Sequence, residues 1–232
     1  MSHDYIKKWD DIFCAQHVIN LVNHISSLFL KNNIKEINYL DIGANVGKVY
    51  DLLSKRISIN KAYLIEASPL LFNYIEQKYI NNSKVEVFNF AAYNEETKIQ
   101  FDQSSMLYQF DTDGSNLNLG LSKIQNTPQS IDVDAKRIST FLNEQQLFSE
   151  LSFIKIDTET VDFMILEDLL KIISLFSIKP LIEFEKNHFV QGISDEQAQY
   201  ILDEFVKHGY KPLNLGQCYG DGLLVPEKFI EL

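Results

Sequence analysis

The sequence predicts an α/β fold, a doubly wound and mostly parallel sheet behind an N-terminal helical cap, and three observations support this. Short apolar segments of strand length alternate with helix-length segments from about residue 34 onwards. The segment from Ile37 to Gly47 has the pattern of a buried strand that runs into a glycine turn and a helix. Hydrophobic residues make up 45% of the 232 residues, so a full core can form. We therefore expect a sheet covered on both faces, with ligands at the carboxyl ends of its strands.

The chain length favours a single domain, because 232 residues suffice for one substantial domain and are few for two. We expect residues 1–33 to form the helical cap and residues 34–232 to form the core. A polar, glycine-containing stretch over residues 103–130 predicts a long loop, and such loops are often binding loops.

The acidic composition argues against two classes of main partner. A net charge of −11 repels phosphates, so we expect no nucleic acid and no anionic membrane as the partner. Cys14 and Cys218 lie far apart, which indicates neither a disulfide framework nor a structural zinc site. No secretory signal and no segment of membrane-spanning length is visible. The simplest expectation is a cytoplasmic protein.

Local signals define the elements of the N-terminal half. Apolar residues at helical spacing predict a cap helix, and short apolar runs predict three strands with helices between them. Ser68-Pro69 marks a helix start, because Ser is favoured as an N-cap and Pro in the first turn. The expected elements are the cap helix over about residues 4–30, strands around 39–41, 62–66 and 85–90, and helices over 46–56 and from 68 to about 79.

The C-terminal half continues the alternation after the predicted loop. Residues 131–138 alternate between apolar and polar, and residues 153–157 form an apolar run that ends in an acid. The expected strands are 99–101, 131–138, 153–157, 180–184 and, at the end, about 210–215 and 222–225; the expected helices are 139–147, 161–176 and 195–207.

The turn after the first strand narrows the choice of ligand. Gly43 and Gly47 let the backbone approach a ligand where a Cβ would intrude. A dinucleotide-binding turn has a third glycine for its pyrophosphate; here it is missing, and Asp41 adds negative charge at that point. A cationic, phosphate-free ligand such as S-adenosylmethionine fits better, and Glu66 at the tip of the next strand suits its ribose hydroxyls. The alternative is a purely structural turn with an incidental surface Glu.

Five motifs follow one another from about residue 38 to the C-terminus. They are Asp41-Ile-Gly-Ala-Asn-Val-Gly47, Ile65-Glu66-Ala-Ser-Pro69, Val87-Phe-Asn-Phe-Ala-Ala92, Arg137-Ile-Ser-Thr-Phe-Leu142 and Ile154-Lys-Ile-Asp157-Thr-Glu159. With these motifs the chain resembles the FkbM family of S-adenosylmethionine-dependent methyltransferases. The first motif is common to many methyltransferases, whereas the last is the family-level signal.

The resemblance implies a Rossmann-like methyltransferase domain and, typically, O-methylation of a hydroxyl on a sugar, a glycan precursor or a small natural product. It implies cofactor contacts from residues of the first three motifs: Asp41, Gly43, Asn45, Gly47, Glu66, Ala67, Ser68 and Ala91. The chain departs from the family after Glu159, where a glycine and a small residue are usual and Thr160-Val161-Asp162 stands instead.

A hydroxyl acceptor benefits from a base, and the candidates at the expected crevice edge are Asp157, Glu159, Glu185 and His188. Asp157 is the best of them, because it ends an apolar strand; its alternative role is a helix N-cap. If Asp157 and Glu185 converge they could hold Mg²⁺, but two carboxylates are a weak metal signal, and an unmetallated pair or a solvated edge is the favoured interpretation. His188 could take a proton near neutral pH or be a plain surface residue.

Two other functions stay open. A nicotinamide-dependent oxidoreductase shares the strand, the turn and the ribose-binding acid, but the missing third glycine argues against it. A cofactor-binding partner subunit without catalytic activity is suggested by the altered residues after Glu159. The acceptor is not specified by any motif, and we expect the 103–130 loop and the cap to select it.

Overall fold

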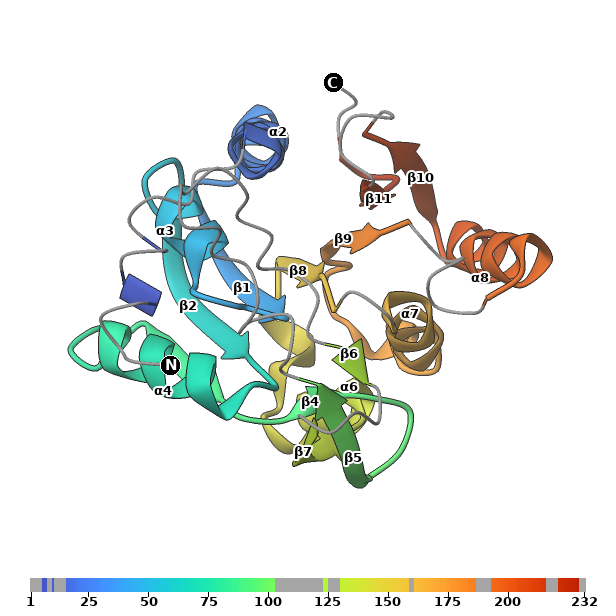
Figure 1. Cartoon of the computed structure of the whole chain (residues 1–232). Coiled ribbons are helices and arrows are strands. Elements are labelled where there is room, and N and C mark those ends of the chain that lie inside the picture. The colour runs from blue at the N-terminus through green and yellow to red at the C-terminus, as the bar shows by residue number, and fades with distance from the viewer. Residues whose placement is uncertain are drawn as a thin grey trace.

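The computed structural model describes residues 6–7, 10, 16–102, 123–124, 130–158, 161–186, 193–215 and 221–229. Its main feature is a seven-stranded sheet in the order β10-β11-β9-β8-β1-β2-β3 (Figure 1). β11 runs antiparallel to both of its neighbours, and the other pairs are parallel. The strands are β1 (Glu36–Ile42), β2 (Ser58–Ile65), β3 (Val85–Phe88), β8 (Phe153–Ile156), β9 (Leu181–Glu185), β10 (Tyr210–Asn214) and β11 (Asp221–Pro226). The predicted doubly wound, mostly parallel fold is confirmed.

Helices cover both faces of this sheet, as Figure 1 shows. Alternate residues of a strand point to opposite faces, so Tyr39 packs in the core on one side and Leu40 in the core on the other. The helices on the Tyr39 side are α2 (Gln16–Lys31), α3 (Lys48–Leu53) and α4 (Pro69–Tyr79); those on the Leu40 side are α6 (Ile138–Glu144), α7 (Asp162–Leu170) and α8 (Asp195–Lys207). Among the described residues, no helix combines the length and apolarity needed to cross a membrane.

A second, four-stranded sheet was not predicted, although it contains the two strands expected over 99–101 and 131–138. Its order is β4-β7-β5-β6, with β4 (Ala91–Ala92), β5 (Thr97–Asp102), β6 (Lys123–Ile124) and β7 (Ser130–Lys136). Two of these strands are two residues long, too short to leave a pattern in the sequence. β6 also falls inside the predicted 103–130 loop, whose residues 103–122 and 125–129 lie outside the described part of the chain.

Helices with strong local signals were predicted best. The Ser68 side chain accepts a hydrogen bond from the Leu71 N–H at the start of α4, as its motif predicts. The predicted helix over 161–176 was too long, because α7 ends at Leu170 and a short 3₁₀ helix follows at Ile173–Leu175. The predicted helix over 46–56 is likewise reduced to α3, since Gly47 adopts a left-handed conformation before it. Of the predicted cap, α2 and the helical residues Ile6, Lys7 and Asp10 are described.

Candidate active site

The glycine turn between β1 and α3 lies at the carboxyl end of the sheet. Gly43 and Gly47 have φ angles of +84° and +75°, and Asn45 between them also has a positive φ of 52°. The N–H groups of Gly43 and Ala44 both donate to the carbonyl of Ile65, at 3.0 Å each. The turn is therefore tied to the end of β2, the neighbouring strand.

The steric reason for Gly43 differs from the sequence prediction. We expected a side chain there to collide with the cofactor, whereas a Cβ at Gly43 would overlap the backbone carbonyl of Asp157, just after β8. A Cβ at Gly47 would meet the Tyr79 hydroxyl of α4. Both glycines thus let the turn pack closely between two parts of its own chain, and a close ligand approach stays a prediction.

Glu66 follows β2 directly and is buried, with 6% of its surface exposed. Its Oε2 accepts a hydrogen bond from the Asn45 N–H and its Oε1 accepts one from the Ser68 N–H, both at 2.8 Å. Burial nevertheless raises the pKa of Glu66 to about 7. Glu66 therefore links the glycine turn to the start of α4, and its predicted contact with a ribose remains a prediction.

Three buried charged residues form a row across β1, β8 and β9. The strand register sets Asp41 beside Lys155 and Lys155 beside Glu183, and none of the three is more than 4% exposed. The Lys155 ammonium lies 3.2 Å from Asp41 Oδ1 and 3.2 Å from Asp157 Oδ2. Burial alone would lower the pKa of Lys155, but the surrounding carboxylates, Asp157 first, raise it above its usual value. Lys155 was not predicted as a site residue, although a lysine inside an apolar strand was a visible signal.

Asp157 emerges beside the glycine turn, as predicted from its place at the end of the strand. Its N–H donates to the Ile42 carbonyl at 3.0 Å, and its side chain is 47% exposed. The alternative role of helix N-cap is wrong, because the N-cap of α7 is Val161 and no side chain caps that helix. Asp157 therefore combines an exposed carboxylate with a buried cation beneath it.

Asp162, the first residue of α7, was missed by the sequence analysis. It is fully buried and accepts hydrogen bonds from the Thr158 N–H (2.9 Å), the Thr158 hydroxyl and the Glu185 N–H (2.9 Å). Burial, and then the charge of Asp157, raise the pKa of Asp162 to about 6. The residues that depart from the family pattern thus include a carboxylate that joins the turn after β8 to the end of β9.

The other predicted site residues are only partly described. Glu185 ends β9 and is partly buried, whereas Glu159 and His188 lie outside the described residues. Ala91 lies in β4 of the small sheet, paired with Ala135. Among the residues that the structure describes, no group of three or more His, Cys, Asp or Glu side chains is arranged to hold a metal ion. The Asp157 and Glu185 pair as Mg²⁺ ligands therefore stays untested.

The site favours a cationic ligand. The Asp41 carboxylate is buried near the end of β1, and the Lys155 ammonium pairs with its Oδ1. The Tyr39 hydroxyl, on the same face of β1, also interacts with this carboxylate: burial, and then Asp41, raise the pKa of Tyr39 well above its usual value. In the described part of the chain, the three carboxylates of Asp41, Asp157 and Glu183 act on the one ammonium of Lys155, so negative charge is in excess there. A ligand with two positive groups, such as the ammonium and the sulfonium of S-adenosylmethionine, fits this excess of negative charge.

Comparison with known sequences agrees with this geometry. A family model described as Methyltransferase FkbM domain matches residues 41–212, which is well over half of the chain. None of the curated proteins matches the chain in sequence.

Solved methyltransferase structures share the fold at low sequence identity. Methyltransferase FkbM from Methylobacillus flagellatus KT has a TM-score of 0.50 and 13% identity, over 94% of this chain and 57% of that one. The putative methyltransferase yhhF from Escherichia coli has a TM-score of 0.51 and 10% identity, over 93% and 88% of the two chains. A putative caffeoyl-CoA O-methyltransferase from Staphylococcus aureus has a TM-score of 0.50 and 12% identity, over 97% and 91%. This chain thus spans only 57% of the length of the Methylobacillus protein.

Proposed function

This chain belongs to the FkbM methyltransferase family, and from that premise we propose that it transfers a methyl group from S-adenosylmethionine to a hydroxyl of a sugar, a glycan precursor or a small natural product. The observation that carries the proposal is the buried Asp41 carboxylate beside the glycine turn, one of three carboxylates that surround the Lys155 ammonium. That position suits the ammonium group of the cofactor and would repel a pyrophosphate.

The residues of the turn suit the rest of the cofactor. S-adenosylmethionine supplies an electrophilic methyl group on a positively charged sulfur. Each carboxylate oxygen of Glu66 uses one lone pair for a backbone N–H and keeps another for a ribose hydroxyl. Glu66 also accepts a hydrogen bond from the Asn45 N–H. The side chain that would hold the ribose therefore also fixes the conformation of the turn.

Asp157 is the proposed base for the acceptor hydroxyl. Its ion pair with Lys155 holds the carboxylate from the buried side, while its exposed part faces the carboxyl edge of the sheet. A positioned base is worth roughly 10²–10⁴-fold in rate. Alignment of the acceptor oxygen with the methyl group contributes up to about 7–11 kcal/mol in the best cases.

Calorimetry tests the cofactor. We expect S-adenosylmethionine to bind and NADH not to bind, because Asp41 disfavours a pyrophosphate. Tighter binding of NADH would favour the oxidoreductase instead. Tyr74 and Lys78 have the Tyr-x-x-x-Lys spacing of some dehydrogenases, but both side chains bind the buried Asp10, which argues against that use.

Methyl release with a panel of hydroxylated acceptors tests the reaction. Asp157→Asn should lose most turnover and keep nearly normal cofactor affinity, while Asp134→Asn, in an exposed ion pair with Lys98, should change neither. Full turnover in Asp157→Asn would remove the base assignment. Loss of activity on chelation, restored by Mg²⁺, would favour the metal-bound alternative. Cofactor binding without methyl release to any acceptor would favour the non-catalytic partner subunit.

A further inference from the structure

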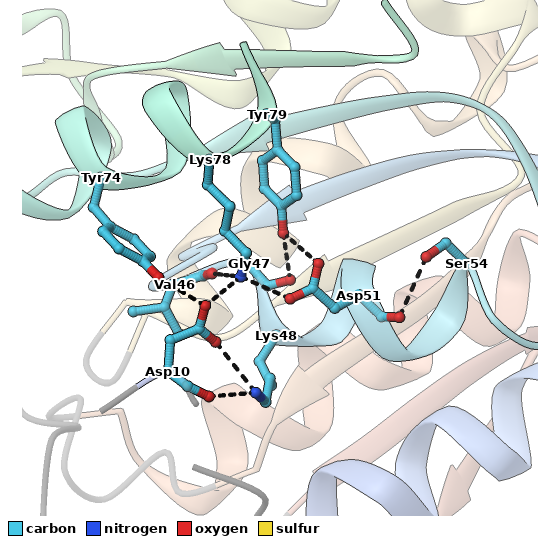
Figure 2. A network of polar contacts seen from close by, with 9 residues as sticks. All are labelled: Asp10, Val46, Gly47, Lys48, Asp51, Ser54, Tyr74, Lys78 and Tyr79. Carbon is cyan, nitrogen blue, oxygen red and sulfur yellow. Dashed lines mark hydrogen bonds and ion pairs between the residues drawn. The ribbon is translucent and has the colours of Figure 1, made fainter. Parts of the chain in front are cut away.

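A second polar network holds the glycine turn from the side of α4 (Figure 2). The Lys78 ammonium donates to the Val46 carbonyl at 2.8 Å, and the Tyr79 hydroxyl donates to the Gly47 carbonyl at 2.9 Å. Both side chains also bind Asp51 of α3, at 2.7 and 2.8 Å. Two carbonyls of the turn are therefore fixed by two neighbouring residues of one helix.

Asp10 also belongs to this network, as Figure 2 shows. Asp10 is 6% exposed, and its carboxylate lies 3.2 Å from the Lys48 ammonium, 2.5 Å from the Lys78 ammonium and 2.9 Å from the Tyr74 hydroxyl. Burial opposes the charge, yet the hydrogen bond and ion pair with Lys78 hold the pKa of Asp10 below its usual value. An ionised carboxylate from the N-terminal segment thus lies between two lysines that flank the turn.

The ammonium of Lys78 has its three donors matched to three acceptors: Asp10, Val46 and Asp51. Lys48 and Lys78 are each only 19% exposed at their side chains, so water screens their charges incompletely. Without the Asp10 charge, less negative charge would balance the ammonium groups of Lys48 and Lys78. Lys78 would then shift toward water, and the Val46 carbonyl would lose its donor.

We propose that Asp10 is a positioning residue for the cofactor turn, so that the contacts of Asp10 with the two lysines and the binding of S-adenosylmethionine favour each other. The inference rests on the cofactor of the proposed function. Lys78 and Tyr79 donate hydrogen bonds to the carbonyls of Val46 and Gly47. Glu66 instead accepts a hydrogen bond from the Asn45 N–H, so two independent sets of contacts fix the turn. Because binding couplings are reciprocal, the cofactor should in turn stabilise the contacts of Asp10.

Hydrogen exchange of the wild-type chain tests the reciprocal effect without any mutation. Addition of S-adenosylhomocysteine should slow exchange in the peptide that contains Ile6 and Asp10 as well as in the glycine turn. A peptide from α8 serves as the internal control and should not change. Protection of the turn with none at Ile6 and Asp10 would overturn the inference and leave the proposed function intact. Absence of calorimetric binding of either S-adenosylmethionine or S-adenosylhomocysteine to the wild type would remove both.

Cofactor affinity of variants tests the direct effect. Asp10→Asn should weaken calorimetric binding of S-adenosylhomocysteine by about tenfold or more, the scale of one charge-assisted hydrogen bond. Asp10→Glu, which keeps the charge, should recover part of that affinity, and Asp134→Asn should bind normally. A purely structural role would lower the melting temperature of Asp10→Asn and leave its affinity unchanged, which would overturn the inference. Should Asp10→Asn fail to fold, the wild-type exchange experiment decides.

Discussion

Lys155 lies among the carboxylates of Asp41, Asp157 and Glu183, with 4% of its side chain exposed. Lys155→Met should destabilise the protein by about 3–5 kcal/mol, because it leaves buried negative charge without its partner. Urea unfolding measures this loss. Lys98→Met is the matched control, since the Lys98 to Asp134 pair is 69% and 74% exposed and such pairs contribute about 0–1 kcal/mol. Equal losses in the two variants would show that Lys155 carries no buried charge.

Glu66 makes stability depend on pH. Its pKa rises from 4.5 to about 7 on folding, so between these values the folded state binds more protons than the unfolded state. The contribution of Glu66 is therefore fully present below about pH 4.5 and is lost as pH rises through about 7. The whole change amounts to at most about 3 kcal/mol.

Urea titrations across pH, with Glu66→Gln beside the wild type, measure that effect. Asp162, with a pKa of about 6, adds a slope of the same sign that overlaps this range, so the Glu66 contribution is read from the difference between the wild type and Glu66→Gln. The stability of Glu66→Gln should fall less with pH than that of the wild type between the two pKa values of Glu66. The surface variant Glu144→Gln should follow the wild type, and identical slopes in all three proteins would contradict the burial argument.

At the scale of elements, Gly43 joins β1 to the segment after β8. Gly43→Ala places a Cβ against the Asp157 carbonyl at a φ of +84°, so we expect a loss of stability as well as of cofactor affinity. Gly209→Ala is the matched control: its φ is +74°, but the nearest atom is the flexible Lys179 ammonium. The control should lose about 1–2 kcal/mol for the backbone alone, and Gly43→Ala should lose clearly more. Thermal unfolding compares them.

Asp162 joins the turn after β8 to the end of β9 through its hydrogen bonds with Thr158 and Glu185. Asp162→Asn should weaken its bonds to Thr158 and Glu185 and lower turnover along with stability, because the loop that carries Asp157 loses its support. Asp168→Asn is the control, since Asp168 is also buried and accepts the Ser139 N–H (2.8 Å) and hydroxyl (3.0 Å) away from the turn. Similar melting temperatures with turnover lost only in Asp162→Asn would support this role. Parallel loss of turnover in both would contradict it.

These elements also show what the sequence can predict. The caps of α4 and α8 depend on neighbouring residues, such as the Ser194 and Gln197 pair that begins α8, and both helices were predicted at nearly their observed bounds. Lys155 pairs with Asp41, 114 residues away, and Asp10 pairs with Lys78, 68 residues away. Such contacts depend on how strands and helices pack together, so no local sequence pattern predicts them. The site residues with short-range motifs were therefore found, and those that support them were not.

At the scale of the whole molecule, the alternation of strands and helices was enough to predict the main sheet. The register of that sheet then brings Asp41, Lys155 and Glu183 into one row from three separate segments. The small second sheet escaped prediction, because its shortest strands exist only as partners of β5 and β7.

The position of β1 between β2 and β8 has a consequence for synthesis of the chain. A chain still growing on the ribosome can pair β1 with β2, but the other edge of β1 stays open until Phe153–Ile156 have been made. An open, apolar strand edge invites pairing with other chains, and a charge on it opposes that. We expect Asp41 to protect the unfinished sheet from aggregation until Lys155 emerges and buries it.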